Sequence, residues 1–139
     1  MTLELIPLCT VDVMLRDPIA VGDGPAGLRL IYEVEEATVK GDRINGRMIG
    51  QASADWLTIT GTLATLDVRA TFETDDGAII FAQYSGRTDI SQGPGELPIY
   101  VAPRFETGDA RYAWLNLVQA AGKGALDGSR LVYEWYELR

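Results

Sequence analysis

Turn-forming residues interrupt this sequence at short intervals, and this punctuation limits the fold more than any other feature. Asn45-Gly46 and Asp75-Asp76-Gly77 suit tight hairpin turns, because Asn, Asp and Gly tolerate positive φ. Residues 21–27 and 91–98 are rich in Gly and Pro, and we expect longer loops there. The segments between these turns are rich in Val, Ile, Leu, Thr and Tyr. That composition is typical of β-strands.

The spacing of the turns predicts an all-β chain. We expect strands over residues 3–15, 28–40, 46–60, 62–74, 78–88, 97–105, 110–118 and 130–138. Leu115, Val118 and Gln119 are also compatible with a short helix, which Gly122 and Gly124 would end. About eight antiparallel strands in one domain spanning residues 1–139 fit a barrel or a sandwich. We favour a closed or nearly closed barrel, because closure removes exposed strand edges.

Charge and hydropathy exclude several classes of protein. The net charge is −8, from 12 basic and 20 acidic residues, so neither nucleic acid nor an anionic membrane is an expected partner. No apolar run reaches the ~18 residues of a membrane-spanning helix. The first 15 residues lack the features of a secretory signal. Cys9 is the single cysteine, so an internal disulfide is excluded and we expect a cytoplasmic protein.

The sequence contains no histidine. This removes the commonest general base, the commonest metal ligand and every Ser-His or Cys-His pair. We therefore expect no metal or organic cofactor, and any catalysis falls to Asp, Glu, Tyr, Arg or Lys. Cys9 has no base to activate it, and we expect it to be a small buried apolar residue.

Charged side chains share one face of the strand predicted at residues 62–74. Apolar and polar residues alternate here, so the two sets point to opposite faces. One set is Leu66, Val68, Ala70 and Phe72, and the other is Asp67, Arg69, Thr71 and Glu73. In an ordinary half-buried strand the charged set faces water. In a barrel whose outer face is covered, that set would line the lumen, where Asp67 and Arg69 can pair.

Aromatic residues mark further candidate pocket walls. Tyr112, Trp114 and Asn116 share one face of the strand predicted at residues 110–118. Apolar area with a few polar groups is typical of a ligand pocket, although an ordinary core has the same pattern. Asp55 stands beside Trp56, and a lone Asp in such a place is more often a turn or capping residue. Tyr133 and Trp135 share a face of the last strand, where we expect a structural role.

Five segments resemble a bacterial domain-of-unknown-function family. They are GPAGLRL, GRMIGQASADWLTI, LDVRATFETDDGAIIFAQYSG, PRFETGDARYAWLN and the final VYEWYEL. The resemblance covers nearly the whole chain and implies an allene-oxide-cyclase-like, calycin-type β-barrel with a polar-lined cavity. The positions that it marks are Asp55, Trp56, Asp67, Arg69, Asp76, Phe105, Glu106, Tyr112, Trp114 and Asn116. Because the family carries these residues together, the lumen interpretation gains over the solvated one.

These observations lead to one leading hypothesis, a cofactor-independent lyase, isomerase or cyclase for a small, partly apolar metabolite. Asp55 or Glu106 would transfer protons, because a pocket with aromatic walls disfavours the charged carboxylate. Arg69, oriented by Asp67, would stabilise an anionic oxygen to which Tyr112 also donates. The residues assigned to catalysis are Asp55, Glu106, Arg69 and Tyr112, and those assigned to substrate binding are Trp56, Asp67, Trp114 and Asn116.

Two alternatives remain open. A lipocalin-like binding protein would use the same residues to orient a small-molecule ligand without converting it. A filled barrel would have a structural or assembly role, with aromatic residues at a subunit interface. The expected partners are a small molecule in the barrel and a second copy of the chain in a homo-oligomer, most simply a dimer.

Overall fold

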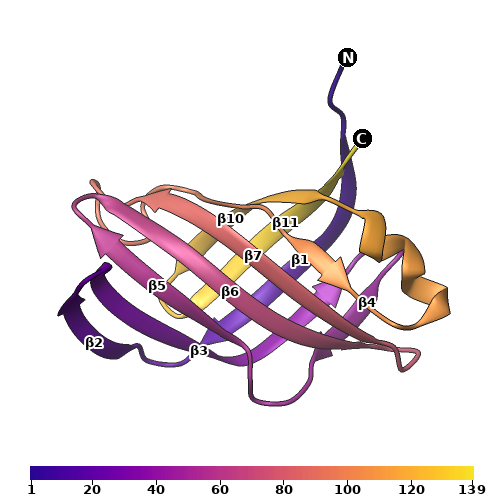
Figure 1. The fold of residues 1–139 in the computed structure, drawn as a ribbon, viewed down its shortest axis with the longest axis horizontal. Coiled ribbons are helices and arrows are strands. Elements are labelled where there is room, and N and C mark those ends of the chain that lie inside the picture. The colour runs from indigo at the N-terminus through magenta and orange to yellow at the C-terminus, as the bar shows by residue number, and fades with distance from the viewer.

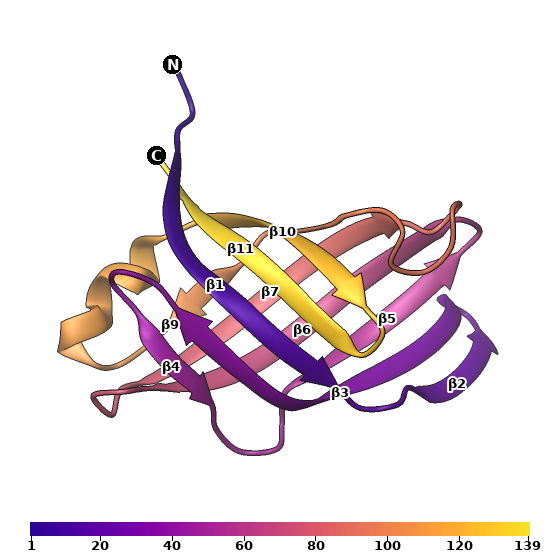
Figure 2. The same ribbon diagram turned by 180° about the vertical axis from the view of Figure 1, so that it is seen from behind.

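The computed structural model describes all of residues 1–139 and contains eleven β-strands and one short helix. The strands are β1 (Leu5–Leu15), β2 (Ile19–Gly24), β3 (Gly27–Lys40), β4 (Asn45–Met48), β5 (Ala54–Thr60), β6 (Leu63–Thr74), β7 (Ile79–Asp89), β8 (Ile99–Val101), β9 (Arg104–Glu106), β10 (Ala120–Asp127) and β11 (Arg130–Leu138). The helix is the 3-10 segment η1 (Ala110–Leu117). Figures 1 and 2 show the strands wound obliquely around one axis. No helix has the length and apolar character needed to cross a membrane.

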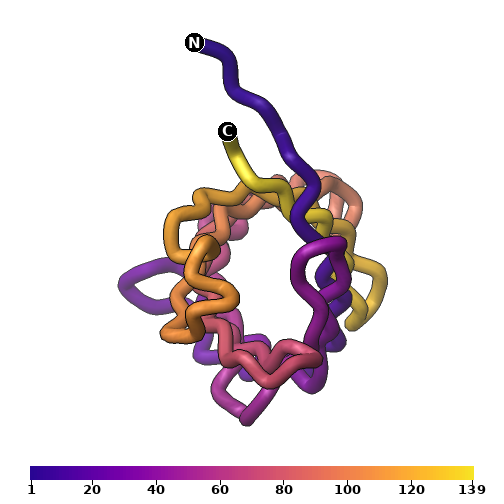
Figure 3. The backbone as a smooth tube through the Cα atoms, turned by 90° about the vertical axis from the view of Figure 1, so that its right-hand side faces the viewer, coloured from indigo at the N-terminus to yellow at the C-terminus, as the bar shows by residue number.

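Eight of the strands close into an antiparallel barrel. Their order is β6, β5, β3, β1, β11, β10, β8 and β7, and β7 pairs back to β6. The view in Figure 3 runs close to the barrel axis and shows the chain circling a central space. The predicted all-β barrel of about eight strands is therefore confirmed. The turn at residues 75–77 follows the prediction, and Gly77 has φ 92°. The tight turn predicted at Asn45-Gly46 was wrong, because both residues belong to β4 and the chain turns at residues 41–44 instead.

Two predicted strands are each divided in two. Residues 46–60 form β4 and β5, which both pair with β3 and β6 but at different heights. Residues 97–105 form β8 and the start of β9, which both pair with β7. The prediction also omitted β2, which pairs only with β3 as an outer hairpin.

The prediction of a strand at residues 110–118 was wrong, because this segment is the helix η1. Asp109 caps it by accepting the backbone N–H of Arg111 at 2.9 Å. The barrel strand lies just after it, in β10, whose sequence AAGKGALD has few strong strand formers. Two of its glycines lie under aromatic rings of β11, since Gly122 pairs with Trp135 and Gly124 with Tyr133. Cross-strand packing, rather than local propensity, makes this segment a strand.

The barrel core fills one half of the interior. The residues that pack there include Val11, Val39, Phe72, Ile80, Phe105, Leu115 and Trp135. Leu115 belongs to η1, which lies beyond β9 at the right-hand end of the barrel in Figure 1. Cys9 is buried in this core, and burial raises the pKa of its thiol to about 12. Its predicted place as a small buried apolar residue is confirmed.

Candidate functional site

The other half of the barrel contains a cavity of about 580 Å³. Its walls come from all eight strands of the closed barrel, and most of the lining side chains are apolar. Its mouth is lined by exposed residues of the connecting segments, among them Arg16, Asp17, Pro94 and Ser129. A cavity of this size in an eight-stranded barrel suits one small ligand.

A β-bulge in β3 controls which of its side chains face the cavity. Leu30, Tyr32 and Val34 line the cavity, whereas the next buried residue is Ala37, three positions on. The pairing of β1 with β3 shifts between Met14 and Leu15, which leaves Glu35 as the extra residue. An extra residue inverts the alternation of side chains beyond it. The bulge thus lets one strand serve both the cavity and the filled half of the core.

Asp55 is the one charged side chain in the lining that is not fully exposed. It enters from β5 on the same face as Leu57 and Ile59. Its Oδ1 accepts the backbone N–H of Asp67 at 3.0 Å, next to a gap in the β5–β6 ladder between the pairs Asp55–Val68 and Thr58–Thr65. The carboxylate thereby replaces a missing backbone partner and is fixed in place.

Burial raises the pKa of Asp55 to about 6. The hydrogen bond from the Asp67 N–H opposes this shift, the negative charge of Asp67 adds to it, and Arg29 opposes it. Removal of a carboxylate from water disfavours its charged form, which is why burial dominates. A carboxyl group with this pKa exchanges protons readily at neutral pH.

Three phenol groups surround the same part of the cavity, those of Tyr32, Tyr84 and Tyr133. Tyr32 is the direct neighbour of Asp55 across the β3–β5 ladder. Burial raises the pKa of all three phenols, and the Asp55 charge adds to each shift. The rings of Tyr84 and Tyr133 meet edge to face with centroids 5.9 Å apart. These phenols are therefore neutral hydrogen-bond donors beside the one cavity carboxylate.

The hydroxyl of Tyr133 is buried without a close hydrogen-bond partner, and the only side-chain hydroxyl that affects its pKa is that of Tyr84. The ring packs directly over Gly124, where an added Cβ would lie 2.5 Å from Cδ1 of the ring. Because an unsatisfied buried hydroxyl is costly, most native structures give it a partner. At the wall of a cavity, a bound ligand can supply that partner.

The structure corrects the predicted orientation of β6. Leu66 and Val68 line the cavity, whereas Asp67 and Arg69 are exposed on the outer face. The lumen interpretation was therefore wrong for this strand, and the charges stay in water, where they need no compensating partners. Trp56 is also outside the cavity lining, and the Arg69 guanidinium lies 5.6 Å from the centroid of its ring.

Four other predicted site residues lie away from the cavity, towards the filled end of the barrel. Glu106 is exposed on β9, and Trp114 packs under Arg43. The hydroxyl of Tyr112 donates to Asp76 at 2.8 Å, and Asn116 accepts the backbone N–H of Thr107 at 2.8 Å. Tyr112 and Asn116 thus hold η1 against neighbouring turns. Neither these residues nor Asp67 and Arg69 form one site with Asp55.

Sequence reasoning missed Tyr32 and Tyr84 and gave Tyr133 a structural role only. Strand alternation contained the signal for two of them. Tyr32 lies between the apolar residues Leu30 and Val34, and Tyr84 follows Ala82 on the apolar face of β7. Assigning the apolar faces to the interior would have placed both phenols beside Asp55.

Comparisons with known proteins extend these observations. A UPF0311 protein of Rhodopseudomonas palustris strain TIE-1 is 29% identical over 152 residues, covering 99% of this chain and 97% of that protein. A β-barrel-like protein of Acinetobacter baumannii AYE has a TM-score of 0.91 at 29% identity, covering 100% of this chain and 98% of that one. An enzyme of Penicillium herquei has a TM-score of 0.71 at 22% identity, covering 98% and 93% of the two chains. At that identity the likeness shows the fold alone.

The model of a family described as "Protein of unknown function (DUF3237)" matches residues 3–138. This match spans every strand of the barrel and all the cavity residues named above. The chain belongs to the DUF3237 family.

Proposed function

We propose that this protein is a cofactor-independent lyase, isomerase or cyclase that acts on a small, partly apolar metabolite in the barrel cavity. Asp55 transfers the proton. The observation that carries the proposal is the position of this carboxyl group, partly buried in an apolar cavity with its pKa raised to about 6. A carboxyl group near its pKa at neutral pH serves as both acid and base.

The phenols give Asp55 a complementary partner. When a base removes a proton from a carbon or a hydroxyl group, negative charge develops on a substrate oxygen. Neutral donors that point at that oxygen lower the barrier without offering a competing base. The hydroxyl of Tyr133 has no close partner, and it and the Tyr84 hydroxyl lie near enough to affect each other's pKa, so a ligand oxygen can compete for the Tyr133 donor. The substrate that fits is largely apolar and has a carbonyl or hydroxyl oxygen beside the proton that is moved.

Deuterium exchange tests this chemistry without knowledge of the natural substrate. Small neutral ketones and enols of a size that suits a cavity of about 580 Å³ are incubated in D₂O, and deuterium uptake at carbon is followed by mass spectrometry. We expect the wild type to accelerate exchange for some members, with a rate that rises as pH passes about 6, because the base form is then populated.

Substitution assigns the exchange to Asp55. Asp55→Asn keeps an oxygen that can accept the Asp67 N–H but cannot take up a proton, so we expect exchange to fall by about 100-fold or more. Asp67→Asn is the matched control on the outer face, and we expect it to retain exchange, with the rise of the rate moved to lower pH because the Asp67 charge adds to the raised pKa of Asp55. Equal exchange by wild type and Asp55→Asn would contradict the proposal.

A binding role is the second candidate, and one observation favours it. Asp55 is the only titratable group of the cavity wall whose pKa is shifted towards neutrality, since the pKa values of the three phenols move further above 10. A carrier needs no second proton donor. If ligands stabilise the protein but are recovered unchanged and without deuterium, the binding role replaces the catalytic one.

A further inference from the structure

An apolar arm projects from the barrel and is not covered by the rest of the chain. The arm consists of residues 1–4, in which Leu3 is 67% exposed, and Leu5 at the start of β1 beside its base is 58% exposed. Its base is held by backbone hydrogen bonds in both directions between Glu4 and Arg139, at 2.6 and 3.0 Å. Figures 1 and 2 show this end of the chain leading away from the barrel beside the C-terminal residues. Exposed apolar residues that stand together often mark an interaction surface.

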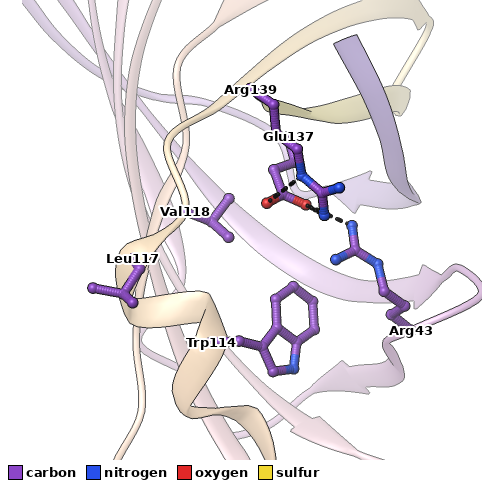
Figure 4. A pocket seen from close by; sticks show the side chains of 6 residues that line it. All are labelled: Arg43, Trp114, Leu117, Val118, Glu137 and Arg139. Carbon is purple, nitrogen blue, oxygen red and sulfur yellow. Dashed lines mark hydrogen bonds and ion pairs between the residues drawn. The ribbon is translucent and has the colours of Figure 1, made fainter. Parts of the chain in front are cut away.

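A groove lies at the same end of the molecule. It has a volume of about 560 Å³ and is lined by Arg43, Trp114, Leu117, Val118, Glu137 and Arg139 (Figure 4). One side is apolar, and its Leu117 is 91% exposed. Figure 4 shows Trp114 and Val118 on the side of η1 and its end that faces the charged residues, whereas Leu117 lies at the rim and points away from them.

The charged side of the groove has two guanidinium groups and one carboxylate among its side chains. Glu137 pairs with Arg43 at 2.7 Å and with Arg139 at 3.2 Å. One carboxylate thus balances only one of two guanidinium groups. The Arg43 guanidinium also lies 4.6 Å from the centroid of the Trp114 ring. In a chain of net charge −8, this groove favours an acidic and apolar occupant.

The arm has the complementary pattern. In an extended segment, Leu3 and Leu5 point to one side and Glu4 to the other. Two leucines match the apolar side of the groove, and the Glu4 carboxylate matches its surplus arginine charge. The exposure of Leu3 shows that the chain's own groove does not cover it. A second copy of the chain has a groove that could cover this arm, and an arm that could fill this groove.

We propose that the arm of one copy occupies the groove of a second copy, and that the exchange is mutual. The geometry favours a closed dimer over an open chain of molecules. Arg139 belongs to the groove and also holds the base of the arm. Because arm and groove are neighbours, one two-fold axis lets both exchanges occur at once, and the assembly ends at two copies.

Light scattering after size exclusion, with sedimentation equilibrium for the affinity, tests the proposal. We expect the wild type to have twice the chain mass of 15.2 kDa. Leu3→Asp in the arm and Leu117→Asp in the groove each place a charge in the apolar contact. We expect each to raise the dimer dissociation constant by about tenfold or more. Val21→Asp is the control, because Val21 is 65% exposed on β2, away from the groove, and it should remain dimeric.

Mixing the two disrupted variants distinguishes arm exchange from any other interface. The Leu3→Asp chain retains an intact groove, and the Leu117→Asp chain retains an intact arm. We expect the mixture to form a heterodimer more tightly than either variant forms a homodimer, because one arm–groove contact is whole. Circular dichroism checks that each variant is folded. We expect both to fold, because both positions are exposed.

Three results would overturn the proposal. The first is a monomeric wild type, which would leave the groove to a small anion or an unrelated protein. The second is a dimer that tolerates both substitutions, which would place the interface elsewhere. The third is loss of association in one variant only, or no gain on mixing, since either would show that arm and groove do not contact each other.

Discussion

The carboxylate of Asp55 and the backbone N–H of Asp67 form a hydrogen bond of 3.0 Å between β5 and β6. Their side chains lie on opposite sides of the barrel wall, since Asp55 lines the cavity and Asp67 is exposed. The same wall therefore gives one aspartate a titration near neutral pH and leaves the other in water. Position across the sheet, rather than residue type, decides which of the two has access to a ligand.

The raised pKa of Asp55 predicts a pH-dependent stability. The pKa is about 6 in the folded protein against an ordinary 3.8, so folding favours the protonated form. The stabilisation is fully present below about pH 4 and is lost as pH rises through about 6. The whole change is up to about 3 kcal/mol in the free energy of unfolding. Urea unfolding of wild type and Asp55→Asn at several pH values measures it.

Asp55→Asn removes this titration. We expect the stability of the variant relative to wild type to rise between about pH 4 and pH 7. Asp67→Asn should keep the pH dependence that Asp55 causes but move it to lower pH, because the Asp67 charge contributes to the raised pKa of Asp55. If the difference between Asp55→Asn and wild type were the same at every pH, Asp55 would not carry the shift.

The unpartnered hydroxyl of Tyr133 predicts a separation between stability and binding. Tyr133→Phe removes a donor that has no partner in the ligand-free protein, so the free energy of unfolding should change by no more than about 0.5 kcal/mol. Affinity for a cavity ligand should fall by about fivefold to tenfold, because one hydrogen bond is lost. Calorimetry with a ligand found in the exchange assay measures the affinity. A loss of stability well above 1 kcal/mol would instead show that the hydroxyl has a partner within the protein.

Gly124 lies under the Tyr133 ring, and we predict that a larger side chain at this position lowers the stability of the protein. In Gly124→Ala the new Cβ would lie 2.5 Å from Cδ1 of Tyr133, so the ring or the strand must move. We expect a loss of about 1–3 kcal/mol and a changed near-ultraviolet circular dichroism signal. Gly108→Ala is the matched control, because nothing lies within 4 Å of its added Cβ. Equal stability of the two variants would contradict the predicted contact.

Adjacent isoleucines on β7 test where the core lies. Ile80 is fully buried and Ile79 is 46% exposed. Truncation of a buried Ile to Ala removes apolar contacts and leaves a cavity, so Ile80→Ala should cost about 2–5 kcal/mol. Ile79→Ala should cost less than about 1 kcal/mol. Chemical denaturation measures both losses. A loss for Ile79→Ala as large as that for Ile80→Ala would contradict the assignment of Ile80 to the core and Ile79 to the surface.

The sequence was sufficient to predict the barrel, because strand alternation and turn chemistry are local signals. Asp75-Asp76-Gly77 sets a turn whose backbone requirement is visible in the residues themselves, whereas Asn45-Gly46 became part of β4. The helix η1 was hidden, because ARYAWLNL is rich in residues that also suit strands. Its conformation depends on distant partners, among them the bond between Tyr112 and Asp76.

Alternation also separated the two faces of β6 correctly but left open which one is inside. The resemblance to a family favoured the charged face, whereas Asp67 and Arg69 are exposed. Burial of such a pair would require near-complete compensation of two desolvated charges, and the apolar residues Leu66 and Val68 avoid that cost. Asp55 was selected, and it lies in the cavity, but the phenols around it come from β3, β7 and β11. Only the register of the closed barrel brings those three strands to Asp55.

The cavity opens to solvent at the mouth lined by exposed residues of the connecting segments. A reactant and a product that both enter by this mouth compete for the same space of about 580 Å³. Turnover would be inhibited competitively by its own product, and the rate of departure would limit the reaction whenever the chemical step is fast.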